Sequence, residues 1–445
     1  MASPHPCASQ SDVFRNFSAL LTGDELAWDR HRCWGPLQSK AAVFVMRCPA
    51  ENHSTRTAIP QVRELFGTMF GWTRTPDAAG LSRSRRRVTE SESVALWTRV
   101  QSWALAHAPP VGGLLPGMSV VAVDGSILHL PRSRSLTRAY PIPKDALELE
   151  QYHYPRANLV SAWDMERRVP LAWCLNSIKV GEREALLDLL PELPEQSVLL
   201  LDRGYPSRSV LGAIVASGRH VVMRMVAAEA GSWPEVAAFV ASGQRSAIVP
   251  VTMQIGRVRR VTQVRLVLRA FDRGRPHRGE LRDQMVVLTT LTDQAAVTDE
   301  AIVDLYHQRW GIETIHREMK TLAALERWHG TTKLLIRQEI HAVMCWFALG
   351  GAIAARAEAD VAKTQREQGD ERPTKRVNTR LLFAAVHKVL TWQCAIGNQH
   401  DAVVGYLRSH AENALDLMLH FMQRRRPGRW NDRVPKHPYA RDIAK

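Results

Sequence analysis

Two short apolar runs, each ending at an aspartate, constrain the fold of this chain more than any other feature. Residues 118–123 (MSVVAV) end at Asp124, and residues 198–201 (VLLL) end at Asp202. Runs of this length without polar alternation are typical of strands that are buried on both faces. Similar strand-like runs at residues 127–130, 157–163 and 169–175, with helical spacing at 182–190, predict a mixed α/β sheet.

The rest of the chain divides into regions that differ in their predicted secondary structure. Strand-like runs dominate residues 218–297 and predict an all-β insertion, whereas short helices are expected before the sheet and mostly helix after residue 298. The run from Arg83 to Arg87 is equally compatible with a solvated basic loop and with a DNA contact. The expected regions are a helical, DNA-binding N-terminal region at 1–112, core parts at 113–217 and 298–350, the insertion at 218–297, and a helical C-terminal region with a basic tail at 351–445.

Composition excludes several classes of protein. Hydrophobic residues at 45% and charged residues at 23% match a globular chain rather than a disordered one. The six cysteines are scattered without C-x-x-C spacing, so no zinc cluster or disulfide framework is indicated. The longest apolar run, 342–355, is too short to span a membrane and predicts a buried helix. Because residues 1–12 resemble no secretory signal, we expect a cytoplasmic protein with no membrane partner.

The charge balance points to a polyanionic partner. Lys and Arg number 59 against 44 Asp and Glu, a formal net charge of +15. Basic side chains gain affinity for nucleic acid by releasing counterions from phosphate. Nucleic acid is therefore the first expectation.

Candidate metal ligands follow from the aspartates. Asp124 and Asp202 end rigid strands, a placement that suits ligands of a hard cation such as Mg²⁺. Strand-end aspartates also commonly initiate turns, and Asp164 meets the same criterion after 159–163. Pattern alone leaves these alternatives open.

A helical stripe adds a third acid. On a helical wheel Tyr306, Arg309, Glu313 and Lys320 fall within about 60° of one another, away from the apolar face of the same segment. One carboxylate flanked by two cations and a phenol can complete a metal site while the cations hold phosphate oxygens. The simpler alternative is a solvated face with an Arg309–Glu313 pair worth only about 0.3–0.5 kcal/mol.

The combination of these residues resembles a known family. Tyr306-x2-Arg309-x3-Glu313-x6-Lys320, together with Asp124-Gly125 and Asp202-Arg203-Gly204-Tyr205, is similar to the DDE transposases of bacterial insertion sequences, over about residues 120–347. The resemblance implies a ribonuclease H-like core that a β-strand insertion interrupts. It also favours Asp202 over Asp164.

The resemblance implies roles for individual residues. Asp124, Asp202 and Glu313 would be catalytic and would bind two Mg²⁺ ions, for which Mn²⁺ would substitute, while Arg203 and the other three residues of the stripe would contact DNA. The expected reaction is cleavage at transposon ends and strand transfer into target DNA by a homodimer or higher multimer, associated with the nucleoid. Two alternatives stay open: a ribonuclease H-like nuclease without strand transfer, and a non-catalytic DNA-binding protein.

Overall fold

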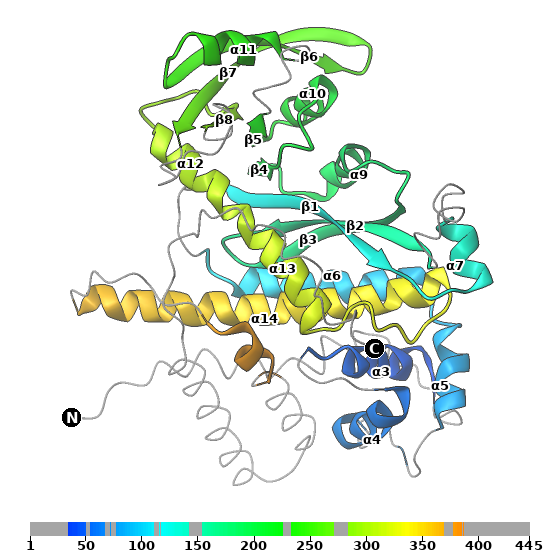
Figure 1. Cartoon of the computed structure of the whole chain (residues 1–445). Coiled ribbons are helices and arrows are strands. Elements are labelled where there is room, and N and C mark those ends of the chain that lie inside the picture. The colour runs from blue at the N-terminus through cyan, green and yellow to red at the C-terminus, as the bar shows by residue number, and fades with distance from the viewer. Residues whose placement is uncertain are drawn as a thin grey trace, which may run out of the picture.

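A mixed sheet of eight strands lies at the centre of the computed structural model (Figure 1). The structure describes residues 34–49, 54–66, 72, 77–110, 115, 117–141, 154–225, 233–270, 284–368, 377–384 and 386. The strands are β1 (Ser119–His129), β2 (Arg156–Asp164), β3 (Val169–Ser177), β4 (Ser197–Leu201), β5 (His220–Met225), β6 (Ser246–Ile255), β7 (Val258–Ala270) and β8 (Gln284–Thr289). Their order is β3-β2-β1-β4-β5-β8-β7-β6.

Strand direction separates the core of the sheet from its extension. β1, β4 and β5 run parallel to one another, and β2 and β3 follow β1 as antiparallel neighbours. β8, β7 and β6 add antiparallel strands beyond β5. The prediction of a mixed sheet with a strand insertion is confirmed.

The insertion differs from expectation in two details. It is not purely β, because α11 (Pro234–Ala241) lies between β5 and β6. Pro234 suits the first turn of a helix, and Val236 and Phe239, three residues apart, bury one side of α11. In addition β5, which lies inside the range expected for the insertion, pairs with β4 and so continues the parallel core.

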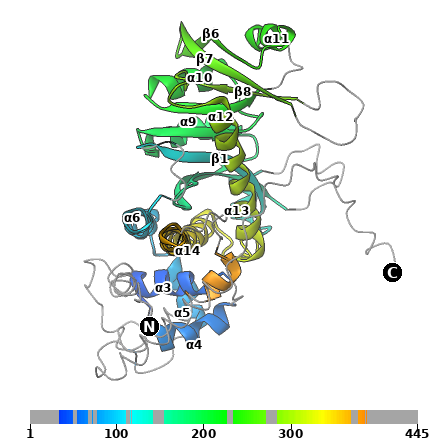
Figure 2. The same ribbon diagram turned by 90° about the vertical axis from the view of Figure 1, so that its left-hand side faces the viewer.

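Alternation along the strands sends side chains into two separate cores. Val120 and Ala122 of β1 join the core beneath helices α12 (Asp299–Gln308), α13 (Trp310–Thr321) and α14 (Lys333–Glu367), whereas Val121 and Val123 join the core beneath α9 (Glu182–Leu189) and α10 (Arg208–Ala216). The same two-residue period applies to β4. Helices therefore cover both faces of the sheet, as the apolar runs predicted (Figure 2).

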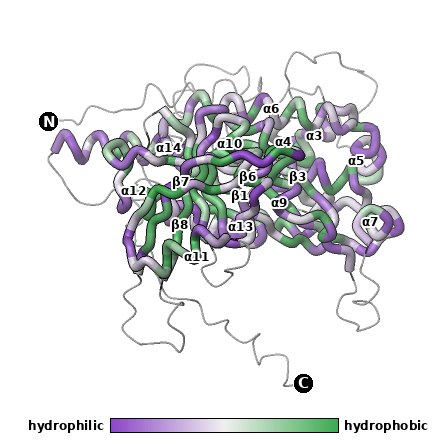
Figure 3. Tube along the Cα trace, turned by 90° about the horizontal axis from the view of Figure 1, so that it is seen from above, coloured by the Kyte–Doolittle hydropathy of each residue, from purple (hydrophilic) through white to green (hydrophobic). Residues whose placement is uncertain are grey.

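The long helix α14 lies beneath the sheet (Figures 1 and 2). It packs against β3 and against the N-terminal helices α3 (Pro36–Met46) and α6 (Glu90–His107), while α4 (Thr55–Phe66) and α5 (Ala78–Arg85) pack on α3. Among the described residues, α14 alone is long and apolar enough to cross a membrane, but 94% of its apolar window is buried within the protein. Its last turns are hydrophilic (Figure 3). The prediction of a buried helix at residues 342–355 is confirmed.

Helix α14 continues across residue 350 without a break, and the short helix α7 (Arg134–Ala139) with the turn η1 (Leu190–Glu192) completes the described elements. The basic tail lies outside the described residues.

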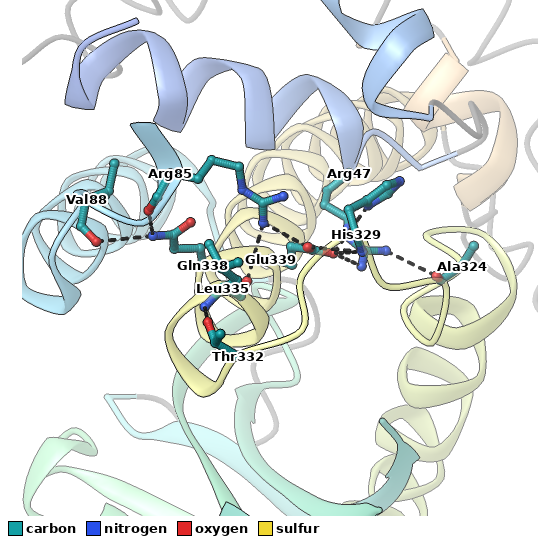
Figure 4. A network of polar contacts seen from close by, with 9 residues as sticks. All are labelled: Arg47, Arg85, Val88, Ala324, His329, Thr332, Leu335, Gln338 and Glu339. Carbon is teal, nitrogen blue, oxygen red and sulfur yellow. Dashed lines mark hydrogen bonds and ion pairs between the residues drawn. The ribbon is translucent and has the colours of Figure 1, made fainter. Parts of the chain in front are cut away.

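A buried ionic network ties the N-terminal helices to α14 (Figure 4). The Glu339 carboxylate of α14, fully buried, pairs with Arg47 and, at 2.8 Å, with Arg85, and it accepts hydrogen bonds from the backbone N–H of His329 at 3.2 Å. Burial alone would raise the pKa of Glu339, but Arg47 and Arg85 outweigh it, and the pKa is lowered. Arg85, which the sequence placed in a solvated or DNA-contacting loop, is thus a structural residue because a buried carboxylate requires its charge.

Candidate functional site

Asp124 of β1 and Asp202, which directly follows β4, lie level at two neighbouring parallel strands. The β1–β4 pairing ends at Ala122 and Leu200, so each aspartate lies two residues beyond the last pair on its own chain segment. By the two-residue period each is on the face that α12 and α13 cover. Asp202 accepts a hydrogen bond from the Gly204 N–H at 2.8 Å, which closes the turn after β4.

Asp124 is not at the end of a strand, contrary to the interpretation of the sequence. β1 continues to His129, paired with β2 from Asp124 opposite Ser161 to His129 opposite Arg156. The change at Asp124 is that β4 no longer pairs with β1 beyond Ala122, which opens one side of the strand. The carboxylate therefore projects from a rigid strand at the point where its parallel neighbour has ended.

Helix α13, which carries Glu313, crosses the face of the sheet on which the two aspartates lie. α12 ends at Gln308 and α13 begins at Trp310, and Arg309 between them keeps helical backbone angles, so the motif occupies two nearly continuous helices (Figure 1). α13 packs against β1, and α12 packs against β4 and β5. This crossing carries Glu313 to the strands that hold the two aspartates.

Arg309 bridges two of the three acids. Its guanidinium lies 2.7 Å from the Glu313 carboxylate and 3.8 Å from that of Asp124. The Arg309 side chain is 8% exposed, whereas that of Glu313 is 47% exposed. The motif stripe is therefore not a solvated face, because its arginine is buried between carboxylates.

The electrostatics of Asp124 reflect a shortage of positive charge. The pKa of Asp124 is raised to about 7. Burial is the largest cause, the nearby carboxylates of Asp202 and Glu182 also raise the pKa, and Arg309 and the Gly125 N–H act in the opposite direction. At neutral pH a buried carboxylate of this kind is only partly ionised. A bound cation would reduce the electrostatic repulsion among these carboxylates.

The expected DNA-contacting residues fall into two groups. Tyr306 is 2% exposed, and the Arg309 guanidinium lies 5.7 Å from the centre of its ring. Both side chains are buried in this arrangement. Arg203 is exposed, and the half-buried Lys320 donates a hydrogen bond to the Ile127 carbonyl of β1 at 2.7 Å.

Asp164, the alternative candidate ligand, lies in a different environment. Asp164, 1% exposed, accepts hydrogen bonds from the backbone N–H groups of Glu166 and Arg167 and pairs with the Arg167 side chain at 3.0 Å. It organises the turn between β2 and β3. That turn is the local role that strand-end aspartates often have.

The three carboxylates are chemically suitable ligands for a hard divalent cation, but they are not grouped closely enough to hold one as they stand. Within the described part of the chain, no three His, Cys, Asp or Glu side chains are grouped so that they could hold a metal ion as they stand. Arg309 occupies the place between Asp124 and Glu313. Carboxylate oxygens in a cluster short of positive charge are the ligands that Mg²⁺ and Mn²⁺ prefer.

Sequence reasoning missed a further acid beside these residues. Glu182, the first residue of α9, raises the pKa of Asp124, and Asp202 raises the pKa of Glu182. Burial raises the pKa of Glu182, and Asp202 raises it further. The glycine after Asp124 was the available signal, since a glycine within a strand often marks a close approach.

The chain is similar to known transposases. A family model described as a transposase DDE domain matches residues 115–348. The transposase InsG for insertion sequence element IS4 of Escherichia coli (strain K12) is 23% identical over 240 residues, which are 52% of this chain and 51% of that protein. The chain therefore spans about half the length of this curated relative.

One solved structure is similar over most of the chain. It is described as a cryo-EM structure of the piggyBac transposase synaptic complex with hairpin DNA, with a TM-score of 0.45 and 11% identity. The similarity covers 97% of this chain and 85% of that chain.

Proposed function

The chain belongs to the family of transposase DDE domains, whose model matches more than half of its length, and from this premise we propose that it is a DNA transposase. The proposed reaction is metal-dependent cleavage of DNA at the ends of a transposable element, followed by strand transfer into target DNA. The observation that carries the proposal is the bridge that Arg309 makes between Asp124 and Glu313, beside the level position of Asp202.

We assign the catalytic role to Asp124, Asp202 and Glu313. Their carboxylates would hold two divalent ions, Mg²⁺ or in its place Mn²⁺, after Arg309 releases Glu313. Bound there, such ions would activate a water or a 3′-hydroxyl for in-line attack on phosphorus and stabilise the leaving oxygen. Asp124 is held within strand β1 and Asp202 directly after β4, whereas Glu313 lies on a helix with its side chain 47% exposed and would be free to move.

The basic residues of the site are assigned by their exposure. Arg203 and Lys320 border the acids at the surface and are proposed to contact phosphates of the DNA strand being cut. Tyr306 and Arg309 are buried, and they are proposed to act on DNA through the position that they give to Glu313. The net charge of +15 supports double-stranded DNA as the partner.

The assembly and location follow from the proposed reaction. Joining two transposon ends to a target requires that two active sites come together, so we propose a homodimer or higher multimer. We place the protein with DNA in the bacterial cytoplasm, at the nucleoid.

The test is cleavage of DNA that carries the element's own ends. We expect D124N, D202N and E313Q each to lower cleavage by at least about 1,000-fold, comparable to the loss of a key catalytic group, while binding of the uncut end persists. D304N is the matched control, because Asp304 lies exposed on α12 and is predicted to leave cleavage within about twofold.

Two outcomes separate the proposal from its alternatives. Cleavage in Mg²⁺ without joining of a labelled 3′ end to plasmid DNA would identify a nuclease. End-binding that survives EDTA, with no cleavage by the unmodified protein in Mg²⁺ or Mn²⁺, would identify a non-catalytic DNA-binding protein.

A further inference from the structure

Glu182 reaches the aspartates from the opposite face of the sheet. It begins α9, whose apolar residues Ala185, Leu186 and Leu189 pack in the core on the side away from α13. A Cβ added to Gly125 would lie 2.1 Å from Oε1 and 2.7 Å from Cδ of Glu182. The carboxylate therefore rests on the backbone directly after Asp124, in space that only glycine leaves open.

Two buried polar groups face the Glu182 carboxylate without a partner of their own. The Tyr205 side chain is fully buried and the Asn158 residue is 7% exposed, and neither the Tyr205 hydroxyl nor the Asn158 Oδ1 has a hydrogen-bond partner. A Cβ added to Gly125 would lie 3.0 Å from Asn158 Oδ1 as well as close to Glu182, and the charges of Glu182, Asp124 and Asp202 all raise the pKa of Tyr205. A buried polar atom without a partner is costly, which indicates that something absent here completes the cluster.

The cluster also lacks a counter-ion. No Lys, Arg or His side chain of the described residues forms an ion pair with Glu182. The neighbouring Arg183 instead donates a hydrogen bond to the Gly204 carbonyl at 2.7 Å and so fixes the start of α9 to the turn that follows Asp202. Glu182 and Asp202 are thereby held together by the backbone although their charges repel.

We propose that Glu182 is a fourth acidic residue of the site and that, with Asp202, it supplies carboxylate oxygens to a divalent cation. Asn158 Oδ1 would serve as a neutral oxygen ligand, and the Tyr205 hydroxyl would donate a hydrogen bond to a ligand carboxylate. Carboxylates, one amide oxygen and water are a common oxygen set for a hard cation. The inference rests on the proposed function, because it adds a ligand to the metal site assigned there.

The first test is Mn²⁺ binding to the full chain, measured by isothermal titration calorimetry. We expect E182Q, which keeps the size of the side chain and an acceptor for Asn158, to lose one Mn²⁺ site or to bind it at least about tenfold more weakly. E184Q is the matched control, because Glu184 is an exposed acid in the same first turn of α9, and it should bind Mn²⁺ as the unmodified chain does.

D202N distinguishes a failure of this inference from a failure of the proposed function. If E182Q binds Mn²⁺ with unchanged stoichiometry and affinity while D202N loses binding, Glu182 only begins a helix and the proposed function stands. If the unmodified chain binds no Mn²⁺, the proposed metal site fails together with the fourth ligand.

A second measurement does not depend on the folding of a variant. With Fe²⁺ in place of Mn²⁺, ascorbate and peroxide generate radicals that cut the backbone next to the bound metal. We expect cuts at residues 181–183 as well as beside Asp124 and Asp202. Cuts beside the two aspartates without any at 181–183 would overturn the assignment of Glu182.

Discussion

His316 lies on the buried side of α13, 6% exposed, with its Nε2 2.9 Å from the Ser161 hydroxyl. The same hydroxyl oxygen accepts a hydrogen bond from the Trp163 indole N–H at 2.9 Å. The Ser161 hydroxyl still has its hydrogen to donate to Nε2 of a neutral imidazole. Burial lowers the pKa of His316 to about 4, and the charge of Lys320 lowers it further.

The first prediction at this scale concerns pH. Because the folded pKa lies below the ordinary value of 6.5, His316 favours folding fully above pH 6.5, and this contribution is lost as pH falls toward 4. The free energy of unfolding of the unmodified protein, relative to H316Q, should fall by up to about 3 kcal/mol between pH 7 and pH 4. Urea unfolding at several pH values measures the difference. A difference between the unmodified protein and H316Q that does not change with pH would contradict the buried, neutral state.

At the scale of elements, the site depends on how α13 and the turn after β4 meet the end of β1. Lys320 donates a hydrogen bond to the Ile127 carbonyl at 2.7 Å, and Trp328 donates one to the His129 carbonyl at 2.7 Å. The segment from α13 onward therefore contacts the part of β1 that β4 does not pair with. Arg203 extends from the turn after β4. Both cations border the same strand ends.

The second prediction follows from that position. R203A and K320A should each weaken binding to a cut transposon end and reduce the slope of log affinity against log salt by about one. Fluorescence anisotropy over a salt titration measures both quantities. K363A is the control, because Lys363 is exposed in the last turns of α14. Equal slopes for all three variants would show that neither basic residue meets phosphate.

The elements were largely predictable because strands and helices follow local periods. The apolar runs at 157–163, 169–175 and 198–201 correspond to β2, β3 and β4. The end of β1 was misjudged because Asp124-Gly125 resembles a turn, whereas pairing with β2 extends the strand to His129. The helix α11 was missed because its eight residues are mostly apolar and give a weak helical period.

At the scale of the whole molecule, α14 and the buried network around Glu339 join the N-terminal helices to the core. Arg47 comes from the end of α3, and Arg85 ends α5, so two distant elements meet at one carboxylate (Figure 4). Gln338 donates to the carbonyls of Arg85 and Val88 and holds the same junction. No local pattern indicates that a basic run contains one buried arginine.

The third prediction tests this junction. E339Q should lower the free energy of unfolding by about 3–5 kcal/mol, because it leaves two buried arginines without their counter-ion. E367Q is the matched control on the same helix, where the exposed pair with Lys363 should contribute less than about 0.5 kcal/mol. Urea denaturation of both variants at pH 7 provides the comparison. A loss in E339Q no larger than in E367Q would mean that the network adds nothing to stability.

The sequence by itself determined the strands, the motif helix and the identity of three candidate acids, because these depend on residue type and short-range spacing. Tertiary structure decided which groups meet: Arg309 between Asp124 and Glu313, and Glu182 against Gly125 from the other face. The reason is physical, since helical and strand periods act over a few residues. The charge and solvation of a carboxylate, in contrast, depend on neighbours that are distant along the chain.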